Sequence, residues 1–570
     1  MLLHRLKEYA DQRLNLPPTL YRIKPVRYVI ELHSSGALLN PEPTDTAEPG
    51  NRQNRRGIER LAPEVQRASG IKPLLLADKA DYTLGYVGSD GKPERVAACH
   101  EAFLDLLNRC ASVTRAPEVA AVQAFLRNNP LERLRLPEGF DPGATITFRV
   151  DGTFVTDLPA VQAFWADEND PASKGASVMT CLVCGEQRPV LDRLQAKVRG
   201  VPGGQLSGTA IISANAEAFE SYGLEASLIA PTCANCGERF TQAINHLLGA
   251  DESRMRLGGM AFVYWTRKKV DIDFLSFFND PQPEQVGTLI GAFRSGRRVP
   301  EVDDTAFFAT VLSGSGGRTV VRDWIDTTVG EVKRHLARWF LRQEIVDAYG
   351  VPALPLKLYA LAAATARDPQ KDLGPPTPRS LLHAALTGTP LPAGLLAQAV
   401  RRTQVEQDVT RPRAALIKLG LIGQGVIQED TMAQLDTDHP SPAYRCGRLL
   451  AVLEQVQQAA LGDVNATIVD RFYGTASTAP ASVFPSLIKN AKNHLHRLRR
   501  DNPGAHYRLQ ERLEEVMPEA TGFPKVLTLA DQGLFALGYY HQRAFDRAQA
   551  RAAAAARRQG AADTQPAPTP

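Results

Sequence analysis

Residues 181–185 read CLVCG and residues 233–237 read CANCG, so the same Cys-x-x-Cys-Gly pattern occurs twice in this part of the chain. Two thiols three positions apart can hold one side of a metal ion, and two such pairs complete the tetrahedral four-sulfur shell that Zn²⁺ prefers. Because four thiolates leave no open coordination position, the predicted zinc is structural. The predicted ligands are Cys181, Cys184, Cys233 and Cys236, with a redox pair or four ordinary thiols as the alternatives.

The composition is typical of a globular protein of several domains, with 570 residues of which 44% are hydrophobic and 22% are charged. A formal net charge of +4 permits a nucleic-acid partner without requiring one. Seven cysteines, four of them in metal spacing, fit a reducing compartment better than a disulfide scaffold. The first residues become charged at once and no apolar run is long enough to cross a bilayer, so we expect a cytoplasmic protein.

Hydrophobic periodicity predicts mixed secondary structure in the first half of the chain. The clearest signal is residues 145–155, which alternate apolar and polar positions around Asp151-Gly152 and predict a β-hairpin. Residues 40–60 are polar and rich in proline and arginine, which predicts a mobile basic loop. The other predicted elements are helices at residues 2–10, 98–110 and 116–127 and strands at residues 26–32, 209–213 and 260–265.

The second half turns helical from about residue 325, and from Met432 onward the pattern predicts helices alone. The predicted fold class is an α+β N-terminal region with an inserted zinc-knuckle module, followed by an all-α C-terminal helical bundle. The predicted segments are an N-terminal α+β domain with a basic loop at residues 1–175, the zinc module and a glycine-rich loop at 176–260, a mixed then helical middle region at 261–431, a helical bundle at 432–547 and a flexible tail at 548–570.

One predicted helix, residues 486–500, gathers cations opposite its apolar stripe. Residues three and four positions apart share a helix face, so these cations form a strip that suits a phosphate backbone. A merely solvated helix face is an equally good interpretation. The cations are Lys489, Lys492, Arg497, Arg499 and Arg500.

Two loops are weaker candidates for a nucleic-acid site. Arg67, Ser69 and Lys72 surround Gly70 in a turn-like setting, where backbone and side chains can approach a phosphate, although basic turns are common. Residues 203–215 form a glycine-rich loop leading to a predicted strand. This loop lacks the Gly-x-x-x-x-Gly-Lys-Ser/Thr spacing of a nucleotide-binding loop, and we interpret it as a rigid presenting element.

No catalytic pattern is recognisable in the sequence: both His-Glu-x-x-His and Gly-x-Ser-x-Gly are absent. The acidic stretch from Asp157 to Asp170 has no partner motif of a nuclease, so a solvated loop is the better interpretation. We therefore expect a protein that is not an enzyme.

Several strings, taken in order, resemble the large subunit (Csd-type) of the subtype I-C CRISPR Cascade complex. No single string is diagnostic, but the ordered set spans nearly the whole chain. The strings are RASGIKP at 67–73, YTLG at 82–85, CLV-x-G at 181–185, GTAIISAN at 208–215, AFESYG at 218–223, VRDW at 321–324, DRFYG at 470–474 and GYYHQR at 538–543.

This resemblance implies a subunit that recognises the protospacer-adjacent motif in duplex DNA and promotes unwinding and R-loop formation, while the guide RNA reads the remaining sequence. It implies partners: crRNA-bound backbone and guide-processing subunits, a small subunit, target duplex DNA with its displaced strand, and a helicase–nuclease that performs cleavage. It also implies that the basic helix holds the displaced strand. The implied contacts near the motif or the fork are Arg67, Ser69, Lys72, Gln205, Ser207, Ser213 and Asn215.

The resemblance further implies that an internal translation start can yield a separate small subunit. Met432 precedes the predicted bundle, so we expect it to be that start; an ordinary linker residue is the alternative. The family pattern has threonine where Cys184 stands and lacks the second cysteine pair. This difference implies that the zinc site is a structural feature of this chain and not part of the mechanism that the family shares. Two other functions remain open, namely a zinc-containing DNA nuclease and a zinc-ribbon scaffold that binds only proteins.

Overall fold

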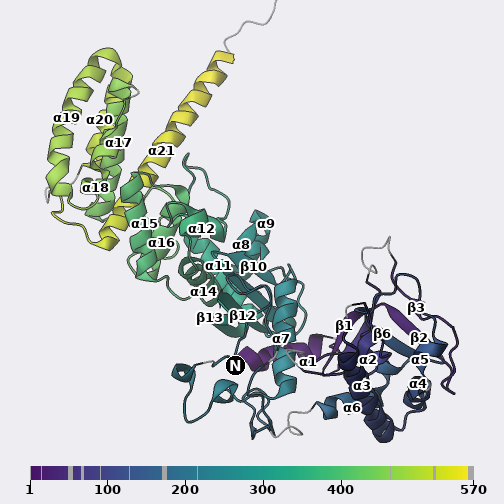
Figure 1. The fold of residues 1–570 in the computed structure, drawn as a ribbon. Helices are drawn as coiled ribbons and strands as arrows, with labels where there is room; N and C mark the ends of the chain where they lie inside the picture. Colours follow the sequence, from purple (N-terminus) through teal and green to yellow (C-terminus); the bar gives the residue numbers. More distant parts are fainter. Residues whose placement is uncertain are drawn as a thin grey trace, which may run out of the picture. The chain divides into compact units, whose positions relative to one another are not determined.

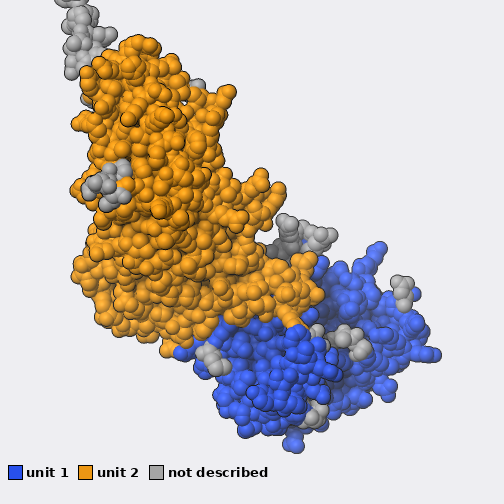
Figure 2. Space-filling view, turned by 90° about the vertical axis from the view of Figure 1, so that its left-hand side faces the viewer, with its two compact units in different colours: residues 1–199, 207–246 blue, residues 200–206, 247–570 orange. Residues whose placement is uncertain are grey.

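The computed structural model describes residues 2–14, 16–18, 20–48, 56–65, 70–89, 91–127, 129–169, 176–194, 196–214, 216–462, 464–517 and 522–562. The chain forms two compact units (Figure 2). Unit 1 comprises residues 1–199 and 207–246, and unit 2 comprises residues 200–206 and 247–570. The finer division into five segments remains a prediction.

Unit 1 contains a sheet in the order β3-β2-β6-β5, with β7 paired to β6 (Figure 1). The strand β2 (Tyr28–Leu32) is buried along its whole length and pairs in parallel with β6 (Ile146–Val150), where the charged side chains Glu31 and Arg149 face each other as an ion pair. A separate antiparallel pair joins β1 (Tyr21–Val26) to β4 (Ile58–Pro63). The remaining strands of the sheet are β3 (Thr44–Asp45), β5 (Ala77–Asp78) and β7 (Thr153–Phe154).

The predicted hairpin at residues 145–155 is confirmed, because β6 and β7 pair in antiparallel register. Its two turn residues, Asp151 and Gly152, have φ values of +46° and +84°. Positive φ at both central positions is the geometry that makes an Asp-Gly pair favourable in a tight hairpin.

Helices cover this sheet and complete the core of unit 1. The longest is α3 (Pro93–Thr114), whose buried residues recur every three or four positions and include Phe103 and Leu107. These side chains share one core with Ile30 of β2 and Phe148 of β6. The predicted helices at 2–10, 98–110 and 116–127 are all present. The helices of this unit are α1 (Leu2–Arg13), α2 (Ala80–Thr83), α3, α4 (Pro117–Arg127), α5 (Pro130–Arg133), α6 (Pro159–Glu168) and α7 (Ala234–Gly249), the last of which continues into unit 2.

One sequence prediction for this half falls partly outside the described residues, and another was wrong. The predicted basic loop at 40–60 includes β3 and the start of β4, where Arg60 pairs with Asp157 and stacks over the ring of Phe154, and its residues 49–55 lie outside the described residues. The predicted strand at 209–213 is absent, because Thr209, which pairs with Val198, and Ala210 form only isolated bridges and residues 211–213 are irregular. A short apolar run becomes a strand only where a neighbouring strand can form backbone hydrogen bonds with it. The remaining short elements here are β8 (Val178–Thr180), β9 (Gln187–Pro189) and the 3-10 turns Val155–Asp157, Glu217–Phe219 and Ala226–Ile229.

Unit 2 begins with an antiparallel sheet of four strands in sequence order. The predicted strand at 260–265 is confirmed as β11 (Met260–Thr266), which is buried at every position. One face of the sheet, including Phe262 and Phe307, joins a core formed with α11 (Val329–Gln343) and α14 (Pro376–Thr387). The other strands are β10 (Arg254–Leu257), β12 (Ala306–Ser315) and β13 (Arg318–Thr328).

Helices make up the rest of unit 2 (Figure 1). From Pro442 onward, every regular element in the described residues is a helix, and α21 continues to Ala562. Among the described residues, no helix combines the length and the apolar character needed to cross a membrane. The further helices are α8 (Ser276–Asn279), α9 (Pro283–Ser295), α10 (Pro300–Asp303), α12 (Leu358–Ala363), α13 (Pro369–Asp372), α15 (Ala393–Glu406), α16 (Arg411–Gly423), α17 (Pro442–Leu461), α18 (Ile468–Ala476), α19 (Pro480–Asp501), α20 (Pro503–Val516) and α21 (Leu529–Ala562).

The helices α17 and α21 cross at two glycines. A Cβ on Gly447 would overlap the carbonyl oxygen of Phe535, and a Cβ on Gly538 would overlap that of Tyr444. Only residues without a side chain let the two backbones approach this closely. The string at 538–543 therefore has a packing role, which its tyrosines extend: the ring of Tyr473 meets that of Tyr539 edge to face at 5.5 Å.

Buried polar groups join the same two helices. Arg448, only 2% exposed, donates from Nε to Oε1 of Gln542 over 2.9 Å and from Nη2 to Glu515 over 2.6 Å. The Tyr444 hydroxyl lies 2.9 Å from Nδ1 of His541, whose complete burial lowers its pKa to about 3. Burying a neutral imidazole costs less free energy than burying a cation. Burial therefore keeps His541 uncharged at neutral pH.

Candidate functional site: a cysteine cluster, an adjoining cavity and a basic helix

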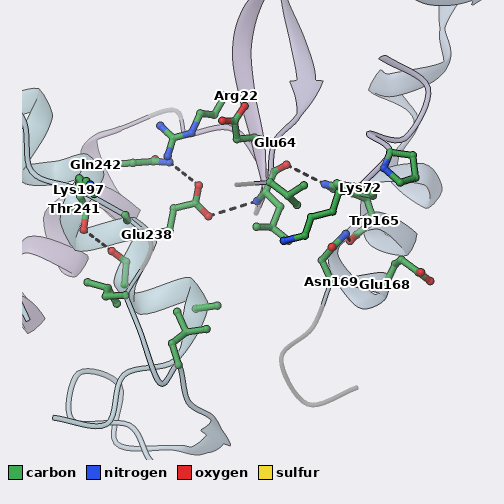
Figure 3. A pocket seen from close by; sticks show the side chains of 18 of the residues that line it. Arg22, Glu64, Lys72, Trp165, Glu168, Asn169, Lys197, Glu238, Thr241 and Gln242 are labelled. Carbon is green, nitrogen blue, oxygen red and sulfur yellow. Dashed lines mark hydrogen bonds between the residues drawn. The ribbon is translucent and has the colours of Figure 1, made fainter. Parts of the chain in front are cut away.

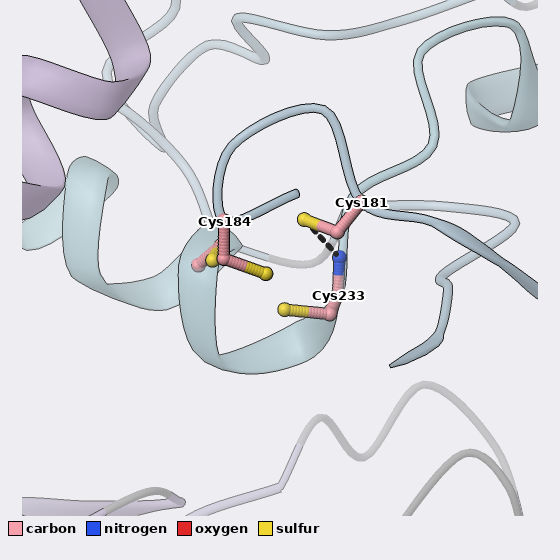
Figure 4. A group of neighbouring side chains, drawn as sticks. Cys181, Cys184 and Cys233 are labelled. Atoms are coloured by element: carbon pink, nitrogen blue, oxygen red, sulfur yellow. Dashed lines mark hydrogen bonds between the residues drawn. The ribbon is translucent and has the colours of Figure 1, made fainter. Parts of the chain in front are cut away.

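The four predicted metal ligands lie together in unit 1. Their sulfur atoms are all within 4.8 Å of one another, and three of the four residues are buried (Figure 4). A tetrahedral site with Zn–S bonds of about 2.3 Å places its sulfurs about 3.8 Å apart. The cluster is therefore of the right size to hold a metal ion. The residues are Cys181, Cys184, Cys233 and Cys236.

The turn between β8 and β9 positions the first cysteine pair. The hairpin of β8 and β9 carries Cys181 and Cys184 in its turn. The amide of Gly185 donates to the Cys181 carbonyl over 2.8 Å, and the Cys181 amide donates to the Glu186 carbonyl over 2.9 Å. Gly185 has a φ of +78°, which explains why glycine follows the second cysteine.

The second pair lies at the start of α7. Cys233 bridges to Val190, directly after β9, and its amide lies 3.4 Å from the Cys181 sulfur. A Cβ on Gly237 would lie 2.6 Å from Cδ1 of Leu194, the far end of a side chain that can shift, so this contact does not by itself require glycine. The helix α1 also contacts the module, since Nδ1 of His4 lies 3.0 Å from the Val183 carbonyl oxygen.

The thiols of the cluster affect one another's protonation. Hydrogen bonding from Cys236 lowers the pKa of Cys233 to about 5, and the same contact raises the pKa of Cys236. Burial raises the pKa of Cys184. One thiolate supported by neighbouring S–H donors is an arrangement that attracts a cation, because thiolates are the metal-binding form of cysteine.

The glycine-rich loop is divided between the two units. Residues 200–206 belong to unit 2, where Gly204 bridges to Gly316 and the amide of Gln205 donates to the Gly316 carbonyl over 3.2 Å. Gly316 and Gly317 form the turn between β12 and β13. The tip of the loop is open, since Gln205 and Ser207 are exposed and Leu206 is fully exposed.

The structure brings only some of the predicted DNA contacts together. Lys72 and Ser207, both exposed, line one cavity of unit 1. Ser213 is half-buried farther along the loop. Arg67, Ser69 and Asn215 lie outside the described residues.

This cavity has a volume of about 640 Å³, and its lining includes Ala234 and Gly237, which adjoin Cys233 and Cys236 in the chain. Figure 3 shows side chains that line it. One wall comes from α6 with Trp165 and Glu168, and the opposite wall comes from α7 with Glu238 and Gln242. Arg22 of β1 reaches the same space. Pockets of a few hundred cubic ångströms with apolar walls and a few polar groups are the usual form of small-ligand sites.

Sequence analysis missed the cavity, because its walls come from segments that are far apart in the chain. Glu238 and Gln242 are four positions apart on α7 and follow the second cysteine pair, which is the only local signal they give. Burial raises the pKa of Glu238, against the opposing effects of the Leu20 amide and Arg22.

The basic helix is confirmed as α19, and its five predicted cations are all exposed. Leu487, Ala491 and Leu495 form the buried stripe on its opposite side. Two of the cations have an acidic partner that the sequence analysis overlooked: Asp501 lies 3.5 Å from Arg497 and 2.8 Å from Arg500. Within the described residues, no ion pair forms at Lys489, Lys492 or Arg499, so these three present uncompensated charge.

A comparison with known protein families explains why the short motifs quoted in the Sequence analysis occur in this order along the chain. A family model described as CRISPR-associated protein (Cas_Csd1) matches residues 3–545, which is nearly the whole chain. A search among curated proteins found no match. Since the family model covers both units and runs through the cysteine cluster, the cavity and α19, the chain belongs to the Cas_Csd1 family, the large subunit of the type I-C CRISPR Cascade complex.

Proposed function

We propose that this chain is a non-catalytic large subunit that recognises the protospacer-adjacent motif in duplex DNA, promotes unwinding and R-loop formation, and helps to recruit the helicase–nuclease. The observation that carries this proposal is the family match over residues 3–545. Membership of Cascade implies assembly with other Cas subunits. In RNA-guided effectors the protein reads a short motif and the guide reads the target, so a large subunit needs DNA contacts and no cleavage chemistry of its own.

The four cysteines are proposed to hold a structural Zn²⁺. The donor set supports this assignment, because four sulfurs within 4.8 Å match the ligands and size of a closed zinc site. When bound, the ion cross-links the β8–β9 turn to the first turn of α7. With four protein ligands it has no position for water or substrate, so its role is to hold the loops in place.

The exposed loop residues are proposed to contact DNA near the motif. Lys72, Gln205 and Ser207 are accessible, and the backbone pairing of Gly204 with Gly316 fixes the first half of the loop. Lysine, glutamine and serine side chains contact phosphates and base edges in protein–DNA complexes. Ser213 is proposed as a further contact, and Arg67, Ser69 and Asn215 extend the set outside the described residues.

We propose that α19 binds the displaced single strand of the target DNA. Three uncompensated cations on one exposed helix face form the kind of sequence-independent positive surface that tracks a phosphate backbone. A solvated helix face would leave binding unchanged when these charges are removed.

Replacing Lys489, Lys492 and Arg499 together with alanine is expected to weaken binding of the displaced strand and to flatten its dependence on salt. Each phosphate contact to a single strand contributes about 0.7 to the slope of log K against log salt, so the slope should fall by about 2. The measurement is the affinity of the assembled, guide-loaded complex for target DNA over a series of salt concentrations.

A matched control removes the same charge elsewhere in unit 2. Lys268, Lys269 and Arg294 are exposed, form no ion pair within the described residues and lie outside α19, so their triple alanine variant should keep the wild-type slope. Equal slopes for the two triple variants would contradict a specific role for α19.

The helices from α17 onward are proposed to be made also as a separate small subunit that starts at Met432. The proposal is supported by the placement of Met432 between α16 and α17 and by the mutual packing of α17 with α18, α19, α20 and α21. Changing the Met432 codon to leucine is expected to remove a short product covering residues 432–570 while the full-length chain remains. Persistence of that product on a denaturing gel would refute the internal start.

A further inference from the structure

The lining of the unit 1 cavity is basic on balance, because five basic side chains line it against three carboxylates, those of Glu64, Glu168 and Glu238. Arg22, Lys197 and Arg199 all line it, and in the described part of the chain neither Lys197 nor Arg199 forms an ion pair with a carboxylate. The other basic lining residue on the α6 side, Arg109, is already paired with Glu168 at 2.7 Å. An anion such as a phosphodiester group is the ligand that such cations attract.

The interior of the cavity offers hydrogen bonds beside apolar walls. Nε2 of Gln242 donates to Glu238 over 3.0 Å, which leaves the buried Oε1 of Gln242 without a partner among the described residues. A buried acceptor without a donor costs free energy until a ligand supplies one. Leu106, Trp165 and Leu191 line the same space and provide flat apolar surface.

We propose that this cavity holds one unstacked nucleotide of the target DNA, taken from the strand that opens beside the motif. Its phosphate lies at the Lys197–Arg199 end, its base lies against the apolar walls, and an N–H of the base donates to Oε1 of Gln242. Nucleobases combine an apolar face with hydrogen-bonding edges, and proteins that extract a base use pockets of this kind. Lys72 and Ser207 at the rim connect the cavity to the loops proposed to contact the motif, so this inference rests on the proposed function.

The test is an abasic scan with the assembled, guide-loaded complex and a full-length chain. Single abasic sites are placed one position at a time along both strands across the motif and the first unwound nucleotides. At one position, loss of the base is expected to weaken binding by at least about fivefold for the wild type. The penalty of the same abasic site should be smaller in the Gln242→Leu variant, because that variant has already lost the hydrogen bond to the base while the apolar walls remain.

Matched variants separate the cavity from general effects. Gln123→Leu makes the same chemical change on α4, outside the cavity. This variant should show the same loss of affinity at each abasic position as the wild type. Arg199→Ala should lower the affinity for intact and abasic DNA by the same factor, because Arg199 is proposed to contact the phosphate and not the base. Thermal unfolding of each variant, unchanged from the wild type, shows that the variants fold.

Equal abasic penalties in the wild type and in Gln242→Leu at every position would overturn the inference. A Gln242-dependent thermal shift caused by a deoxynucleoside monophosphate, without any coupling in the scan, would also overturn it by assigning the cavity to free nucleotides. Failure of the proposed function looks different, because the wild-type complex would then show no preference for motif-bearing DNA even when the duplex is intact.

Discussion

Replacing Cys236 with serine is expected to abolish zinc binding and to destabilise unit 1. Three thiolates and a hydroxyl no longer form the four-sulfur shell, and the β8–β9 hairpin, whose strands are three residues long and largely exposed, loses its metal link to α7. A ligand held at a thousand times its Kd contributes about 4 kcal/mol, which sets the scale of the expected loss. Metal analysis and thermal unfolding of the purified chain provide the two measurements.

The control for this variant is Cys99→Ala, which removes a buried thiol of unit 1 outside the cluster. That variant should keep one zinc per chain and should still lose stability when a strong chelator is added. In Cys236→Ser the chelator should have no effect. A wild-type chain with far less than one zinc, or a serine variant that retains it, would rule out the structural zinc.

Replacing Gly538 with alanine is expected to separate α17 from α21. The added Cβ would overlap the Tyr444 carbonyl oxygen and lie 2.9 Å from its carbonyl carbon, and a backbone cannot rotate away as a side chain can. Overpacking of a well-packed interior typically costs about 1–3 kcal/mol, so we place this variant at about 3 kcal/mol or more. The loss should lower the melting temperature of unit 2 by at least about 5 °C.

Gly474 on α18 provides the matched control, because nothing lies within 4 Å of a Cβ added there. Gly474→Ala should be neutral or stabilising by up to about 1 kcal/mol, since alanine favours a helix over glycine. If both variants melt at the wild-type temperature, the close crossing of α17 and α21 is not what requires glycine at residue 538.

Elements set by local chemistry were predictable from the sequence. The two Cys-x-x-Cys-Gly patterns identified the cysteine cluster, and Asp151-Gly152 identified a hairpin whose turn needs positive φ at both positions. Helices such as α3 and α19 followed from their apolar stripes. In each case the residues that decide the structure are neighbours in the chain.

Elements set by distant partners were not predictable from the sequence. Residues 209–213 look like a strand, but only isolated bridges form at Thr209 and Ala210, whereas β4 forms because β1 lies beside it and pairs with its backbone. The cavity combines β1, α6 and α7, so Arg22 and Gln242 meet only in the folded chain. On α19 the periodicity located the cations, whereas Asp501 just beyond the helix stripe was overlooked.

The central claim is that this chain gives Cascade its preference for motif-bearing duplex DNA. The most direct measurement is the affinity of the guide-loaded complex, assembled with and without this chain, for duplexes that share one target sequence and carry either the native flank or a scrambled one. We predict that the complete complex binds the native flank far more tightly than the scrambled flank and that the preference vanishes without the chain. An equal preference in both assemblies would contradict the account.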